Sequence, residues 1–96
     1  MNARDPWLAK VWSAPDGVHI DVRGLAAPQP LTQILRLVIE VHQGSLASTA
    51  STASAIIVHH DRDPVHLYPE LLQLGWWAER IDGEPGEVRL RLAPVA

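Results

Sequence analysis

The fold depends most on one stretch of the chain, Asp21-Val22-Arg23-Gly24-Leu25-Ala26-Ala27-Pro28-Gln29-Pro30, which leads directly into the apolar segment 31–41. It predicts the end of a strand, a tight glycine turn and a helix, because Pro28 and Pro30 fit only the first turn of a helix. The start of a helix attracts anions and lowers the pKa of a thiol placed there. The position that could use this effect, Ala27, has no reactive group.

The segment 24–30 resembles the Gly-Leu-x-Cys-Pro-x-Pro motif of the TusA/SirA sulfur-carrier proteins, with Ala27 in place of the cysteine that carries the persulfide. Further pieces are similar to an offshoot of that family, a cysteine-less TusA-like domain family of unknown function that is often associated with hemerythrin-like domains. These pieces are His60-Asp61-Arg62-Asp63-Pro64, Leu67-Tyr68, residues 79–82, Pro85 and Arg89-Leu90-Arg91-Leu92. Together they cover about residues 18–92 of the chain.

The resemblance implies which residues form the motif positions. Three features depart from the family pattern: Arg62 replaces a histidine, Pro69 lies inside the expected second helix, and a Ser/Thr/Ala-rich tract follows the first helix. The implied motif positions are Gly24, Ala27, Pro28, Pro30, Asp61, Asp63, Pro64 and Tyr68.

Length, charge and cysteine content limit the class of protein. A chain of 96 residues makes a single domain with one modest two-layer core. The 8 basic and 11 acidic residues argue against nucleic-acid binding, which needs a surplus of basic residues on one face. The absence of cysteine removes disulfides, thiolate metal sites and thiol catalysis. Without a signal peptide or an apolar stretch of about 20 residues, we expect a cytoplasmic protein that does not enter a membrane.

The N-terminal segment 1–17 is expected to be a helical extension. An Asp-Pro pair is typical of a helix start, and the spacing of the apolar side chains predicts a short amphipathic helix over residues 6–13. Its tryptophans, Trp7 and Trp12, carry too much apolar surface to stay free in solution. Docking on the domain itself is the simpler interpretation, because buried aromatic side chains are usually structural, and docking on a partner is the alternative.

The rest of the pattern predicts four strands and two helices in the order βαβαββ. The expected strands are 18–22, 55–58, 76–82 and 87–92, the helices 31–41 and 64–74, and the Ser/Thr/Ala-rich tract 44–54 a loop. Right-handed crossovers place both helices on one face of the sheet. The fold class is therefore α+β, a two-layer α/β sandwich, for which the resemblance implies a mixed four-stranded sheet in the order 1-2-4-3.

The helix pattern gives three local predictions. The side chains of the first helix that face the core are Leu31, Ile34, Leu35, Val38, Ile39 and His42. Asp63 caps the second helix, with Pro64 in its first turn. Pro69 lies deep enough in that helix to kink or split it.

The face of the sheet away from the helices carries polar side chains. Alternation along the strands places Val18, Ile20 and Val22 inward, and the outward side chains are His19, Asp21, Arg23, Arg89 and Arg91. This face is either solvated or a docking surface. In the second case the partner-binding residues are Arg89 and Arg91 together with Trp7 and Trp12.

The densest polar cluster consists of His59, His60, Asp61, Asp63 and His66. Neighbouring side chains in a strand point to opposite faces, so His59 and His60 cannot hold the same ion unless the strand ends there. His60, Asp61 and His66 could converge on a transition metal if the loop folds back. The simpler interpretation is that Asp61 and Asp63 place negative charge at the start of the second helix.

Two classes of function remain. The first is a non-catalytic interaction or accessory domain that binds a protein partner, with a homodimer as one option, and needs no cofactor. The tryptophans and the absence of a nucleophile–base pair favour it, so we predict that the chain is not an enzyme. The alternative is a metal- or haem-binding accessory protein that uses His59, His60 and His66. Sulfur relay is excluded, because Ala27 cannot hold a persulfide.

Overall fold

The computed structural model describes residues 9–43 and 55–95, which form five strands and two helices. The elements are β1 Lys10–Ala14, β2 Gly17–Asp21, α1 Gln29–His42, β3 Ile56–His60, α2 Leu67–Gln73, β4 Trp76–Ile81 and β5 Val88–Pro94. The strands make one sheet in the order β1-β2-β3-β5-β4. The pair β2/β3 is parallel, and the other neighbours are antiparallel.

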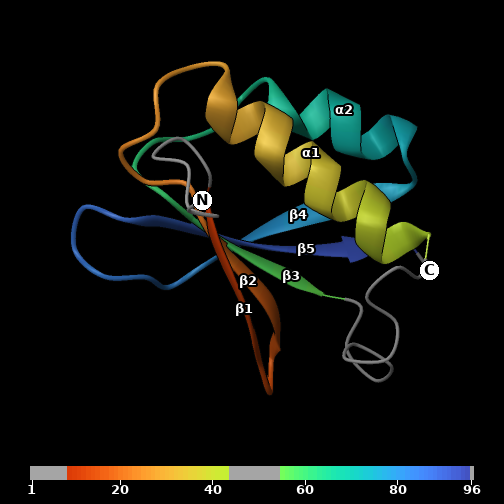
Figure 1. Cartoon of the computed structure of the whole chain (residues 1–96), viewed down its shortest axis with the longest axis horizontal. Helices are drawn as coiled ribbons and strands as arrows, with labels where there is room; N and C mark the ends of the chain where they lie inside the picture. The colour runs from red at the N-terminus through yellow and green to blue at the C-terminus, as the bar shows by residue number, and fades with distance from the viewer. Residues whose placement is uncertain (1–8, 44–54, 96) are drawn as a thin grey trace, which may run out of the picture.

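The predicted α+β class is confirmed, with a mixed sheet and two helices. The four expected strands are β2, β3, β4 and β5, and they follow one another in the sheet in the expected order. Figure 1 shows α1 and α2 together on one side of the sheet. Neither helix in the described part of the chain is long and apolar enough to cross a membrane.

The predicted N-terminal helix and the four-strand count are wrong, because Lys10–Ala14 is a fifth strand at the edge of the sheet. Trp12 lies opposite His19 in the β1/β2 hairpin. The tight turn before Gly17, whose φ is 138°, returns the chain on itself, so β1 lies beside β2. The spacing of apolar residues over such a short segment does not distinguish a helix from a strand, and pairing with β2 makes this segment a strand. Trp7 and the 44–54 loop lie outside the described residues.

The core lies between the sheet and the two helices. Its buried members are Val18, Ile20, Val22, Ile34, Leu37, Val38, Ile56, Val58, Leu67, Leu71, Trp76, Leu90 and Leu92. The predicted inward side chains of the strands are therefore confirmed. In α1 the prediction is wrong at Ile39, which is 41% exposed, and at His42, which is also exposed, while Leu37 is buried instead. The buried residues of α1 are Pro30, Ile34, Leu37 and Val38, and Leu31 and Leu35 are partly buried against the core.

The second helix begins three residues later than predicted. It runs over Leu67–Gln73, so Pro69 is its third residue and needs no intrahelical N–H bond. The predicted kink is therefore wrong. The predicted cap at Asp63 is also wrong: the residue before the helix is His66, and no side chain caps it. The Asp63 carboxylate instead accepts a hydrogen bond from the Tyr68 hydroxyl at 2.5 Å.

Candidate functional site

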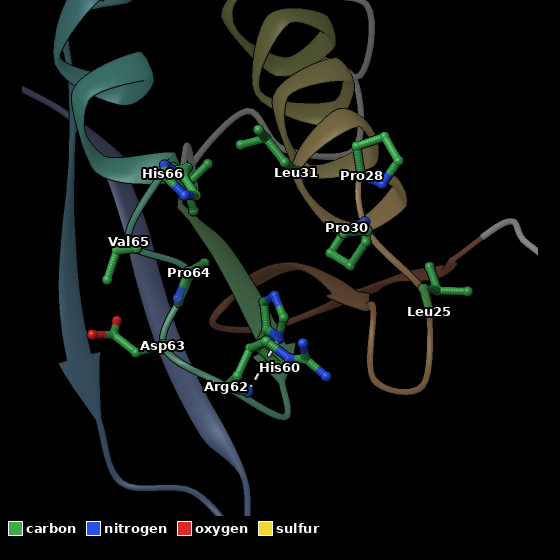
Figure 2. A pocket seen from close by; sticks show the side chains of 12 residues that line it. Leu25, Pro28, Pro30, Leu31, His60, Arg62, Asp63, Pro64, Val65 and His66 are labelled. Carbon is green, nitrogen blue, oxygen red and sulfur yellow. Dashed lines mark hydrogen bonds between the residues drawn. The ribbon is translucent and has the colours of Figure 1, made fainter.

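A pocket of about 350 Å³ lies between the start of α1 and the connection from β3 to α2 (Figure 2). Its walls are mostly apolar. The lining residues are Leu25, Ala27, Pro28, Pro30, Leu31, His60, Arg62, Asp63, Pro64, Val65, His66 and Leu67. Five of the eight motif positions thus line one pocket, and they come from two stretches about thirty residues apart in the chain.

One hydrogen bond ties the two motif stretches together beside the pocket. The Gly24 N–H donates to Oδ2 of Asp61 at 3.1 Å. This hydrogen bond lowers the pKa of Asp61, because the amide dipole stabilises the carboxylate. Gly24 has a φ of 84°, a conformation that glycine adopts without strain. Asp61 and Gly24 therefore hold the loop before α1 against the end of β3.

The first turn of α1 offers one free amide to the pocket. Pro28 and Pro30 have no N–H, and the Gln29 N–H is bonded to the Ala26 carbonyl at 2.9 Å. The Thr32 N–H is bonded to the Pro28 carbonyl at 3.0 Å. Of the amides from Gln29 to Thr32, only that of Leu31 has no acceptor among the described residues. The positive end of the helix dipole still faces the pocket, because Pro30 and Leu31 are part of its wall.

His60 places one hydrogen-bond donor in this apolar pocket. Its Nδ1 accepts from the backbone amides of Asp61 at 2.9 Å and Arg62 at 3.3 Å. Nδ1 also lies 3.1 Å from Oδ1 of Asp61, and in the tautomer in which it accepts from the two amides the ring proton lies on Nε2. Nε2 has no partner among the described residues and still reaches solvent, because no buried side-chain nitrogen or oxygen of the described residues lacks a partner, although the His60 side chain as a whole is only 3% exposed. Figure 2 shows the ring standing between Pro30 and Pro64, with this edge turned into the pocket.

The other polar side chains of the pocket do not converge on His60. Asp63 points away from it in Figure 2, toward its bond with Tyr68. Burial, together with this hydrogen bond, raises the pKa of Tyr68 to about 12. His66 lies at the far end of the pocket. The Arg62 side chain is 72% exposed and bonds Asp61 at 3.4 Å.

Of the residues considered for a metal site, His60 and Asp61 lie 3.1 Å apart, but no third ligand joins them among the described residues. His59 and His60 point to opposite faces of the sheet, as predicted, because His59 contacts His19 and Glu87 while His60 lines the pocket. Among the described residues, no group of three or more His, Cys, Asp or Glu side chains is placed to hold a metal ion. The set His60, Asp61 and His66 therefore has no shared centre.

The open face of the sheet carries a hydrogen-bonded network that the sequence did not reveal. His19 Nδ1 and His59 Nε2 lie 2.8 Å apart, and both side chains are buried. At the outer ends, His19 Nε2 bonds Asp16 Oδ1 at 2.7 Å and His59 Nδ1 bonds Glu87 Oε2 at 2.5 Å. The expectation that His19 is exposed to solvent is therefore wrong.

Two of the predicted partner-binding residues on this face, Arg89 and Trp12, contact other side chains of the domain, although Trp12 remains 41% exposed. Arg89 donates to both carboxylate oxygens of Glu87, at 2.9 and 3.1 Å. Trp12 stacks on His19 and His59, with ring centroids 5.1 and 5.4 Å apart. Arg91 lies beside Arg89 on the same face of β5 and is half-buried. Strand alternation alone places His19 and Arg89 on one face of the sheet. The sequence could not show that the Glu87 side chain turns toward His59 and bonds it.

No protein-family model matches the chain, and no curated protein or solved structure shows significant similarity to it. The site must therefore be interpreted from its own chemistry. The chain is a small α+β domain in which an apolar pocket at a helix start contains one imidazole nitrogen without a partner among the described residues. A second, separate polar network covers part of the opposite face.

Proposed function

We propose that this chain is a non-catalytic interaction domain, in which the pocket beside Ala27 receives an apolar side chain of a protein partner. The observation that carries the proposal is the Nε2–H of His60. A ligand that fills the pocket removes Nε2 from water, and a donor left unpaired there would then cost on the order of 1 to 3 kcal/mol. A ligand that places a backbone carbonyl beside its apolar group avoids that cost, so the pocket combines apolar contact with one directional hydrogen bond.

The pocket favours binding over catalysis. A nucleophile needs a side-chain base within hydrogen-bond reach, and the lining residues include no cysteine or serine. Nδ1 of His60 is occupied by two backbone amides, so it is not free to remove a proton. Asp63 is bonded to Tyr68. Asp63 and Nδ1 of His60 are thus engaged within the domain, and the lining residues offer no side-chain nucleophile on which Nε2 of His60 or the ring of His66 could act as a base.

The size and edge of the pocket favour a protein segment as ligand. A volume of about 350 Å³ is near the lower end of small-molecule sites, roughly 300 to 1,000 Å³, and suits one anchoring side chain. Val65, 57% exposed at the pocket wall, adds apolar surface for the flanking residues of the segment. A partner side chain that fills the pocket would also cover Val65.

The resemblance to the cysteine-less TusA-like family supports the same proposal. In the TusA/SirA sulfur carriers the loop before the first helix holds the persulfide-carrying cysteine, and here Ala27 leaves that loop without a sulfur carrier. We propose accordingly a cytoplasmic domain that acts without a cofactor and without nucleic acid or membrane. No specific observation favours the metal- or haem-binding alternative over this proposal.

Peptide selection tests the proposal directly. Peptides are selected from a random phage-displayed library on the native protein, and their affinities are measured by fluorescence anisotropy. We expect Ala27→Phe, which fills the pocket, to lower affinity at least tenfold, whereas Leu72→Phe, on the exposed face of α2, leaves it unchanged. His60→Asn keeps an acceptor for the two amides but removes the Nε2 donor, and should lower affinity by roughly tenfold.

Two results would contradict the proposal. One is a selection that yields only peptides bound equally well by the native protein and Ala27→Phe. The other is a selection that yields no peptide from a library in which apolar residues are well represented.

A further inference from the structure

The hydrogen-bonded chain on the open face needs one more ring proton than two neutral imidazoles carry. Asp16 and Glu87 each accept a hydrogen bond from the outer nitrogen of one ring, so the outer nitrogens of His19 and His59 both carry protons. A neutral imidazole has one ring proton. If both rings were neutral, the two inner nitrogens would face each other with lone pairs at 2.8 Å.

The geometry of the rings supports a hydrogen bond between the inner nitrogens. The ring centroids are 5.1 Å apart and the ring planes differ by 23°. With the nitrogens 2.8 Å apart, the rings meet edge to edge in nearly one plane, because each nitrogen then lies between the two ring centres. An N–H directed at a lone pair requires this arrangement. From this geometry we propose that His19 and His59 form a site for one extra, shared proton, and that its loss releases the edge strand β1.

The surroundings favour a positive charge on the pair. The hydrogen bond from His19 lowers the pKa of Asp16. Burial alone would raise the pKa of Glu87, but hydrogen bonds from Arg89, the Glu84 amide and His59 outweigh it and lower that pKa to about 2. Both carboxylates are therefore ionised at neutral pH, one at each end of the pair.

The other charged groups around the pair balance one another. Asp21 is bonded to Arg23 by two hydrogen bonds of 2.9 and 2.8 Å, and Glu87 is bonded to Arg89. The groups on the neighbouring elements of this face are Lys10 on β1, Asp16 in the β1–β2 turn, Asp21 and Arg23 at the end of β2, Glu84 and Glu87 before β5, and Arg89 and Arg91 on β5. They comprise four carboxylates and four cations, so the shared proton does not add to a surplus of positive charge.

The coupling to β1 passes through Trp12 and Asp16. The indole of Trp12 is tilted by only about 21° from both imidazole planes, so a positive charge on the pair attracts its face. Asp16 joins the β1–β2 turn to His19. β1 pairs with β2 alone, so these contacts support a strand that has a single neighbour. When the proton leaves, the inner nitrogens repel, His19 moves, and both contacts of β1 weaken.

The shared proton can be counted in the native protein by NMR. Correlation spectra between the ring nitrogens and carbon-bound ring protons distinguish protonated from bare nitrogens. We expect protons on three of the four ring nitrogens of His19 and His59 at neutral pH, followed by the loss of one as the pH rises. Two neutral rings with bare inner nitrogens at neutral pH would overturn the proposal.

Hydrogen exchange in the same samples tests the coupling. We expect protection of the β1 amides to fall at least tenfold over the pH range in which the third proton leaves, while protection of β5 stays constant. His66→Gln, on the other face, should keep this pH step, and His59→Gln should abolish it. Constant β1 protection across the loss of the proton in the native protein would overturn the coupling, even if His59→Gln does not fold.

Discussion

Ala27 lies in the pocket wall at the start of α1, where one added sulfur atom would introduce new chemistry without a change of shape. The neighbouring helix presents one free amide, that of Leu31, and the positive end of its dipole. Both favour a thiolate over a thiol. The residue at position 27 thus decides whether the loop is reactive or only binds.

We expect Ala27→Cys to fold normally and to have a thiol pKa below that of a free cysteine, about 8.5. The pH dependence of its alkylation by iodoacetamide gives the pKa, and a melting curve reports the fold. The matched control is Leu72→Cys on exposed α2 surface, since the native chain has no cysteine. Equal thiol pKa values in the two variants would show that the helix start does not act on position 27.

Glu87 is the carboxylate whose ionisation should matter most for stability. Its side chain is 2% exposed, and its pKa is lowered from 4.5 to about 2. A lowered pKa means that the folded protein favours the ionised form, so the stabilisation is complete above pH 4.5 and is lost as the pH falls from 4.5 to 2. The shift corresponds to on the order of 3 kcal/mol.

Chemical denaturation across this pH range checks the contribution. The native protein should lose more free energy of unfolding between pH 4.5 and 2 than Glu87→Gln, which cannot ionise. Glu79→Gln on β4, where the side chain is exposed, should behave like the native protein. If native protein and Glu87→Gln lost the same amount, the low pKa of Glu87 would not contribute to folding.

At the scale of elements, α1 shows how tertiary contact selects which of its apolar side chains are buried. Leu37 is 4% exposed and Ile39 is 41% exposed, although both belong to the same apolar run. We expect Leu37→Ala to lower the free energy of unfolding by about 2 to 5 kcal/mol, through lost contact and a cavity. Ile39→Ala should cost less than about 1 kcal/mol. Urea denaturation of both variants measures the two losses in free energy of unfolding. Equal losses would mean that α1 is rotated about its axis, so that Leu37 and Ile39 are equally buried.

The same competition between local pattern and tertiary contact explains the errors at β1 and α2. The segment around Trp12 has an apolar spacing that fits a helix, but its pairing with β2 satisfies backbone groups along a whole strand. Pro69 looks disruptive only if α2 starts at Pro64. Since α2 starts at Leu67, the proline falls in the first turn, where it is tolerated. The periodicity of the apolar residues predicted whether most elements are helices or strands. Where each element begins and ends depends on its contacts with neighbouring elements.

At the scale of the whole molecule, the side of the sheet that carries the helices was predictable from the crossover rule, whereas the strand order was the one that the family resemblance implied. The pocket was partly predictable: the Ala27 loop and the His60–Pro64 segment were both singled out, but not their contact through Gly24 and Asp61. The His19–His59 pair was not predictable. Its partners are 40 residues apart, and their ring orientations depend on Asp16 and Glu87.

His59 and His60 are consecutive residues of β3, yet one belongs to the network on the open face and the other to the pocket. Side chains alternate along a strand, so a slip of β3 by one residue against β2 and β5 would exchange the two environments. A one-residue deletion within β3 would therefore disable both sites together, whereas substitutions can change either one alone. We expect β3 to be more sensitive to a change in length than to a substitution at either of the two sites.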